Sequence, residues 1–149
     1  MSDYTEEVAE KLNDIIEKNI DAHKGFEKAA ENAGSHSLAN YFKDKASKRK
    51  KFVSELKQEV RGTGEEVEDD GSVTGSVHRT WMDVKAFFSA DDDESMLEES
   101  IRGEKAAVEE YRDALECNLP DGTMRVLRNQ LQTIESDLSE IKTLEDIKD

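Results

Sequence analysis

The sequence is poor in several residue types, and each shortage excludes a class of structure or chemistry. Its 149 residues include one cysteine, Cys117, and one proline, Pro120. A single cysteine excludes an intrachain disulfide and a cysteine-based zinc site, and we expect Cys117 to be a partly buried residue at a helix end. The sequence has no glycine-rich phosphate loop, Gly-x-Ser-x-Gly elbow or Cys/His nucleophile arrangement. We therefore expect a protein that is not an enzyme.

Long hydrophobic runs are also missing. No uninterrupted apolar stretch approaches the roughly 20 residues that a membrane helix requires. The first residues, MSDYTEE, are acidic and no apolar core follows them, whereas a secretory signal has a basic start and an apolar run of about 7–15 residues. These shortages predict a cytoplasmic protein.

Positive charge is scarce relative to negative charge. The chain has 36 Asp and Glu against 21 Lys and Arg, and its formal net charge is −15. Such a surface repels the phosphates of nucleic acids and of anionic membranes, so we expect neither as a partner. Acidity could attract cations or basic partners, but it also simply keeps a protein solvated and soluble. The remaining expectation is an unidentified protein partner or self-association, with a homodimer as one form.

What the sequence does contain is apolar residues at helical spacing. They recur at i, i+3, i+4 and i+7 in four long segments and one shorter segment, and no strand pattern competes with them. The predicted helices span residues 4–32, 37–61, 72–89, 93–117 and 121–147. A chain of this length fits one domain, so we predict a single all-α domain over residues 1–149.

The connections between the predicted long helices indicate their topology. Gly34 and the serines around it separate the first two, and Pro120 with Gly122 separates the last two. Short connections make each pair an antiparallel hairpin, while the middle connection of roughly 30 residues can run the length of a bundle. A four-helix bundle with one long crossover, here containing a fifth, shorter helix, is the ferritin-like pattern.

Three segments of the sequence are similar to a known family. They are HRTWMDVK at 78–85, GEKAA at 103–107 with Tyr111 and Leu115 after it, and EIKTL at 140–144. These segments resemble an uncharacterised bacterial family of ferritin-like four-helix-bundle proteins, catalogued as a domain of unknown function. The likeness runs over nearly the whole chain, and its Arg-x-Trp-Met-Asp-x-Lys signature is fairly specific. The resemblance implies a fold and a link to stress responses, but no reaction.

The ligands of a di-iron bundle are incomplete in this chain. Such a site takes a Glu from each of two helices and a Glu-x-x-His from each of the other two. The three histidines are His23, His36 and His78, and none has Glu three residues before it. We therefore expect no cofactor and no metal. The alternative is a divergent bundle in which Glu104, His23 and Glu27 bind one iron or manganese ion.

Polar residues lie where such a metal would be held. At about 100° per residue, Asn19 lies on the axis of the first apolar stripe with His23 beside it, while Arg49 and Glu104 lie on the second and third. We expect Arg49 and Glu104 to form a buried ion pair, with Asn19, His23 and Tyr111 completing its hydrogen bonds. Opposite signs favour pairing, because a buried charge without a partner is costly. The sequence predicts a non-enzymatic structural or interaction protein with a metal-free core.

Overall fold

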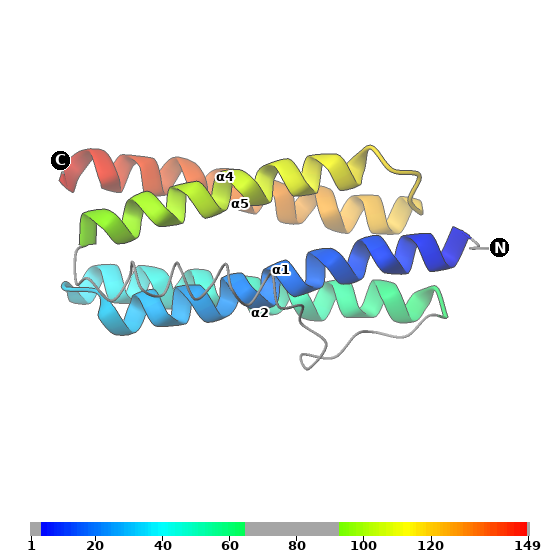
Figure 1. Ribbon diagram of the computed structural model, residues 1–149, viewed down its shortest axis with the longest axis horizontal. Coiled ribbons are helices and arrows are strands. Elements are labelled where there is room, and N and C mark those ends of the chain that lie inside the picture. Colours follow the sequence, from blue (N-terminus) through cyan, green and yellow to red (C-terminus); the bar gives the residue numbers. More distant parts are fainter. Residues whose placement is uncertain (1–3, 65–92, 149) are drawn as a thin grey trace.

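The computed structural model describes residues 4–64 and 93–148, and within these ranges the chain forms four long helices and no strand (Figure 1). They are α1 (Tyr4–Asn32), α2 (His36–Gly62), α4 (Asp93–Leu115) and α5 (Asp121–Lys148). The predicted all-α class with four long helices is confirmed. The predicted short helix at 72–89 lies outside the described residues. None of the four described helices is apolar over a stretch long enough to cross a membrane.

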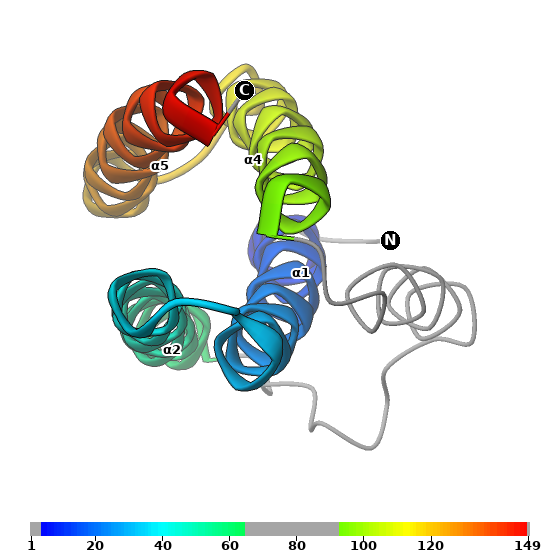
Figure 2. The ribbon, with the colours of Figure 1, turned by 90° about the vertical axis from the view of Figure 1, so that its left-hand side faces the viewer.

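The four helices pack as two antiparallel hairpins. α1 lies against α2 and α4 lies against α5, while α1 with α4 and α2 with α5 form the contacts between the hairpins (Figure 2). α2 and α4 run in the same direction, so α4 begins at the end of the bundle where α2 begins (Figure 1). The chain between α2 and α4 therefore joins opposite ends of the bundle.

Ser35 closes the turn between α1 and α2. Its backbone is extended, and its hydroxyl accepts a hydrogen bond from the Leu38 N–H at 3.2 Å. The bond satisfies one of the N–H groups that the first turn of a helix leaves without a partner. Leu38 itself is buried, so the cap also places the first apolar residue of α2 in the core.

The turn between α4 and α5 departs from the sequence expectation at one residue. α4 ends at Leu115, two residues before the predicted end, and Cys117 is exposed instead of partly buried. The prediction for Cys117 was wrong because the helix has ended before this residue, so it no longer follows the buried face. Leu119 is buried instead and covers this end of the core.

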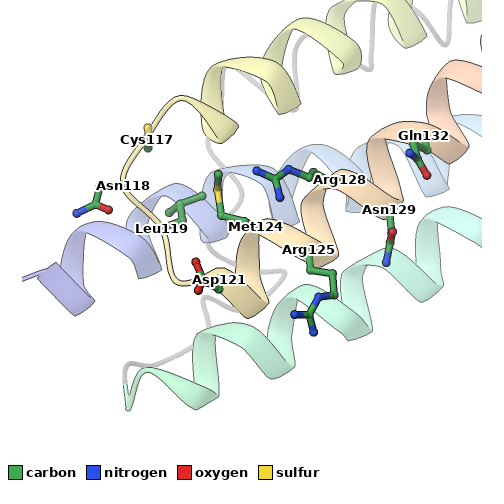
Figure 3. Close-up of a pocket in the computed structure, with 9 residues that line it drawn as sticks. All are labelled: Cys117, Asn118, Leu119, Asp121, Met124, Arg125, Arg128, Asn129 and Gln132. Atoms are coloured by element: carbon green, nitrogen blue, oxygen red, sulfur yellow. The ribbon is translucent and has the colours of Figure 1, made fainter.

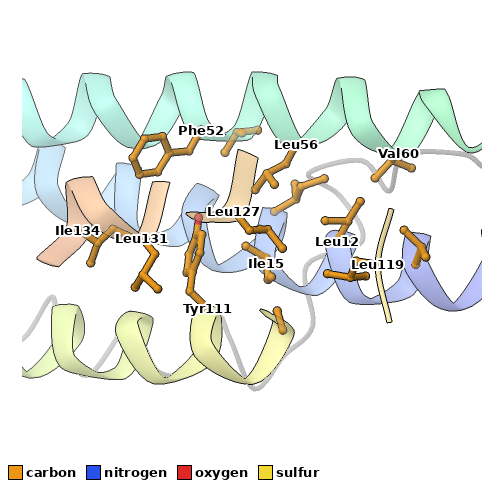
Figure 4. Packing of buried hydrophobic residues seen from close by; sticks show 14 of the residues in the cluster. Leu12, Ile15, Phe52, Leu56, Val60, Tyr111, Leu119, Leu127, Leu131 and Ile134 are labelled. Atoms are coloured by element: carbon orange, nitrogen blue, oxygen red, sulfur yellow. The ribbon is translucent and has the colours of Figure 1, made fainter. Parts of the chain in front are cut away.

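The apolar core consists of two clusters along the bundle axis. The first cluster lies toward the α4–α5 turn (Figure 4), and residues such as Leu12, Leu56, Leu127 and Ile134 are fully buried in it. The second lies toward the α1–α2 turn, and its members include Phe26, Phe42, Met96, Leu97 and Ile141. Buried polar side chains, among them Arg49 and Glu104, lie where the two clusters meet.

Candidate functional site

A layer of polar side chains separates the two apolar clusters. Along α2, Arg49 lies between Ala46 of the second cluster and Phe52 of the first, and the other helices pass from one cluster to the other at a similar level. The buried polar side chains centred at this level also extend into the edges of both clusters, and Tyr111 packs in the first cluster as well. We call them the polar layer: Asn19, Lys45, Arg49, Glu104, Tyr111, Gln130 and Asp137. Each of the four helices contributes at least one of them, so the layer spans the bundle.

Glu104 lies at the centre of the polar layer and is 1% exposed. The Arg49 guanidinium donates to one carboxylate oxygen of Glu104 through Nη2, and Lys45 Nζ donates to the other at 2.8 Å. Both cations come from α2, which lies across the bundle from α4. Each oxygen of the carboxylate therefore has its own cationic donor, the arrangement that a buried charge requires to be stable.

Neutral side chains continue the layer from Arg49 toward the first cluster. Arg49 Nη1 donates to Asn19 Oδ1 at 2.9 Å, and Asn19 Nδ2 donates to the Tyr111 hydroxyl at 2.9 Å. The hydroxyl donates to Gln130 Oε1 at 2.7 Å, and Gln130 Nε2 donates to Glu55 Oε1 at 2.9 Å. This chain of hydrogen bonds touches all four helices, so it links their positions along the bundle axis.

Tyr111 holds its proton throughout the physiological range. Burial raises the pKa of its hydroxyl to about 12, although the nearby Arg49 charge acts in the opposite direction. A neutral hydroxyl can donate one hydrogen bond and accept another. Tyr111 uses both capacities, because it accepts from Asn19 and donates to Gln130.

Charged side chains continue the layer from Glu104 toward the second cluster. Lys45 is 1% exposed, and its Nζ lies 3.5 Å from Asp137 Oδ2 and 4.8 Å from the centroid of the Phe26 ring. The other Asp137 oxygen accepts from Lys48 Nζ at 3.0 Å, at the rim of the bundle. Burial lowers the pKa of Lys48, but the hydrogen bonds and charges of Asp137 and Asp44 together outweigh burial and raise it overall.

The structure brings together four of the five residues expected in the buried polar core: Asn19, Arg49, Glu104 and Tyr111. The fifth, His23, does not reach them. Its Nδ1 lies 2.8 Å from the Ala46 carbonyl oxygen, and its side chain is 22% exposed. The expectation for His23 fails because this residue lies about one helical turn beyond Asn19, level with Ala46 instead of Arg49.

The alternative metal ligands Glu104, His23 and Glu27 do not converge. His23 Nε2 lies 3.3 Å from Glu27 Oε1, whereas Glu104 is bonded to Arg49 and Lys45. Two cations beside the carboxylate repel a metal ion. Among the described side chains, no three His, Cys, Asp or Glu residues are grouped to hold a metal ion. The described residues therefore do not fit a di-iron centre of the kind that ferritin-like bundles hold.

Sequence reasoning missed three residues of the polar layer: Lys45, Gln130 and Asp137. Lys45 lies four residues before Arg49, on the same face of α2, and both point into the core. Gln130 and Asp137 lie seven residues apart, within the apolar stripe of α5. The signal for all three was a polar residue at a position of an apolar stripe. Such positions had to be compared across all four helices to predict which side chains meet in the core.

A polar pocket lies apart from the polar layer, beside the α4–α5 turn (Figure 3). Its volume is about 490 Å³, and its charged lining residues are Asp121, Arg125 and Arg128. All three are exposed, so solvent screens their charges. The pocket therefore lacks the desolvated, fixed charges that the polar layer provides.

Together, the fold and the site define an all-helical bundle whose core carries a charged polar layer that joins all four helices. Residues 7–117 match the family model described as Domain of unknown function (DUF2383), and the chain belongs to this family. The match includes all of the polar layer except Gln130 and Asp137. No curated protein matches the sequence.

Proposed function

We propose that this chain is a non-enzymatic structural or interaction protein whose helical bundle is held together by its own buried ions instead of a metal. The observation that carries this proposal is the coordination of Glu104. Both of its carboxylate oxygens accept hydrogen bonds from cations, Arg49 and Lys45, in a site that excludes water. A metal ion at this carboxylate would have to displace one or both of these cations, whose charges repel it.

The charges of the polar layer balance within the core. Two buried cations, Lys45 and Arg49, face two buried carboxylates, Glu104 and Asp137. In a metal bundle, a cation from solution neutralises the inward carboxylates. Here two side chains of α2, Lys45 and Arg49, supply that positive charge, so the charges of the polar layer balance as soon as the helices assemble. We infer that the layer also selects one arrangement of the helices, because a shifted helix would leave a buried charge without its partner.

The topology proposed for the bundle is ferritin-like. Three features support this topology: the two antiparallel hairpins, the parallel direction of α2 and α4, and the single long connection between these two helices. The likeness of the HRTWMDVK, GEKAA and EIKTL segments supports a bacterial source and a role in the stress response.

The surface favours polar contacts with any partner. Among the described side chains, Tyr4 is the one large hydrophobic residue that is exposed, at 42%. Stable interfaces normally have an apolar centre, whereas charged contacts give weaker, salt-sensitive association. We therefore propose that the bundle engages its partner through charged surface residues and binds it transiently.

Titration calorimetry of the chelator-treated protein with ferrous iron and with manganese, under anaerobic conditions, tests the proposal. We expect no binding heat from the wild type, and a Glu104→Gln variant that is less stable than the wild type. Stoichiometric binding that Glu104→Gln abolishes would contradict the proposal and favour a divergent metal-binding bundle. His23→Gln is the companion variant, because it removes the only histidine of the alternative ligand set without touching the polar layer.

A further inference from the structure

The helix α2 is basic, although the chain as a whole is acidic. Its residues include eight Lys or Arg and three Asp or Glu, whereas the formal net charge of the chain is −15. Two of these cations, Lys45 and Arg49, are buried in the polar layer. Lys48 bonds to Asp137 at the rim of the polar layer, whereas the role proposed for the core does not use the remaining five.

Four cations of α2 lie in one line along the helix. At about 100° per residue, they fall within about 40° of a common direction, and the two residues that share this line are serines. We call this line the basic stripe: Lys43, Ser47, Lys50, Ser54, Lys57 and Arg61. It contains no carboxylate and extends over about 27 Å at the helical rise per residue.

The basic stripe faces solvent and has no partner in the described part of the molecule. Lys43, Lys50 and Arg61 are exposed, and Lys57 is half-buried. No ion pair joins any of these four to a carboxylate among the described side chains, in contrast to Lys48 on another face of α2, which is paired with acidic residues. Within residues 4–64 and 93–148, an anionic partner could therefore bind the stripe without breaking an ion pair of the fold.

The spacing of the cations indicates the shape of that partner. Lys43, Lys50 and Lys57 are seven residues apart, which places the cations about 10.5 Å from one another. Seven residues is the period at which two α-helices return the same faces to each other when they pack side by side. Carboxylates at seven-residue intervals on a second helix would meet each lysine in turn.

Other anionic occupants fit this surface less well. A nucleic acid strand carries a charge about every 3.4 Å, far denser than the cations of the stripe. The stripe has no large apolar side chain to anchor it in a membrane. In a second copy, Glu7 and Asp14 are exposed at this spacing but Asp21 is buried, and two copies of charge −15 repel each other.

We propose that the basic stripe is a docking surface for an acidic α-helix of another protein, with carboxylates at seven-residue intervals. This inference rests on the interaction role proposed above and assigns that role to one face of α2. Because the contact is made of exposed ion pairs, it is weak, fast and sensitive to salt.

The test uses a labelled helical peptide of about three heptads, with Glu at one position of each heptad and no other acidic residue. Fluorescence anisotropy measures its binding to the full chain at low ionic strength. The stripe variant is Lys43→Gln/Lys50→Gln/Lys57→Gln. Its matched control carries the same change in charge at exposed lysines of other helices: Lys24→Gln/Lys105→Gln/Lys142→Gln.

We expect the stripe variant to bind the peptide about tenfold more weakly than the wild type, the combined effect of three exposed ion pairs. The control should bind within about twofold of the wild type, and about 0.15 M salt should weaken the wild-type complex. A peptide with Gln in place of each Glu should not bind. All variants should keep the wild-type thermal midpoint, since the stripe makes no contact in the core.

Equal losses in the stripe variant and the control would show that only net charge matters and would overturn the proposal. So would an absence of peptide binding, tighter binding to duplex DNA or to vesicles containing phosphatidylglycerol, or a dimer that the stripe variant dissociates. None of these results bears on the polar layer, whose test is the metal titration of the wild type and Glu104→Gln.

Discussion

Removing one member of the Arg49–Glu104 ion pair should destabilise the fold far more than removing both. Glu104→Leu leaves Arg49 without a carboxylate partner and Lys45 with Asp137 as its remaining one. Arg49→Met leaves Glu104 with Lys45 as its single cationic donor. In the double variant the remaining pair, Lys45 and Asp137, is still balanced.

The magnitude follows from the burial of both side chains, since Arg49 is 4% and Glu104 1% exposed. Breaking a buried pair by removing one partner costs about 3–5 kcal/mol, whereas replacing both by apolar residues is often neutral. Here the double variant also leaves Asn19 Oδ1 without its donor, which costs about 1–3 kcal/mol. We therefore expect the double variant to be at least about 2 kcal/mol more stable than the sum of the single effects predicts.

Urea unfolding followed by circular dichroism measures these free energies. The matched control is Glu135→Gln, which breaks an Arg–Glu ion pair with Arg112 at 2.9 Å whose two side chains are largely exposed. It should cost no more than about 1 kcal/mol. Single-variant effects that add within about 0.5 kcal/mol would refute the reasoning, because they would show that Arg49 and Glu104 do not act as a pair.

Four further predictions follow from other contacts. Lys45→Met should lower the unfolding free energy by about 3–5 kcal/mol in urea titrations, because it leaves both buried carboxylates short of a cation. Since burial raises the pKa of Tyr111 from 10.0 to about 12, the folded protein keeps a proton that the unfolded chain releases. The contribution of Tyr111 to the free energy of unfolding should therefore hold below about pH 10 and be lost as the pH rises toward 12. Over this range, the urea midpoint of Tyr111→Phe should fall less steeply than that of the wild type. Phe42→Ala, at a fully buried site, should cost about 3–5 kcal/mol by calorimetry. Ser35→Ala should cost about 1 kcal/mol in the same assay, through loss of the α2 cap.

The long helices could be predicted from the sequence because their signal is local. Apolar residues at helical spacing, together with Gly34 and Pro120 between segments, mark the helices without reference to the rest of the chain. The same counting placed Arg49 and Glu104 on the axes of their stripes. A charged residue at such a position either pairs in the core or destabilises the fold, so local periodicity also carried information about long-range contacts.

The remaining features depend on how the helices are placed relative to one another along the bundle axis. His23 shares a face with Asn19, but its level places it against the backbone of Ala46. Lys45 reaches Glu104 because its long side chain crosses between helices, which angular counting on α2 alone does not reveal. The periodicity of the sequence gives the direction of a side chain around its own helix. Which side chains of other helices it contacts depends on how far each helix is shifted along the bundle axis.

The most direct test of the metal-free core is elemental analysis of the purified protein, expressed in iron-supplemented medium and gel-filtered without chelator, together with its thermal midpoint before and after addition of ferrous iron. Ion pairs that already satisfy Glu104 predict metal far below one ion per chain and an unmoved midpoint. Stoichiometric iron or manganese with a raised midpoint would contradict the proposal and show that a metal, not Arg49 and Lys45, neutralises the core.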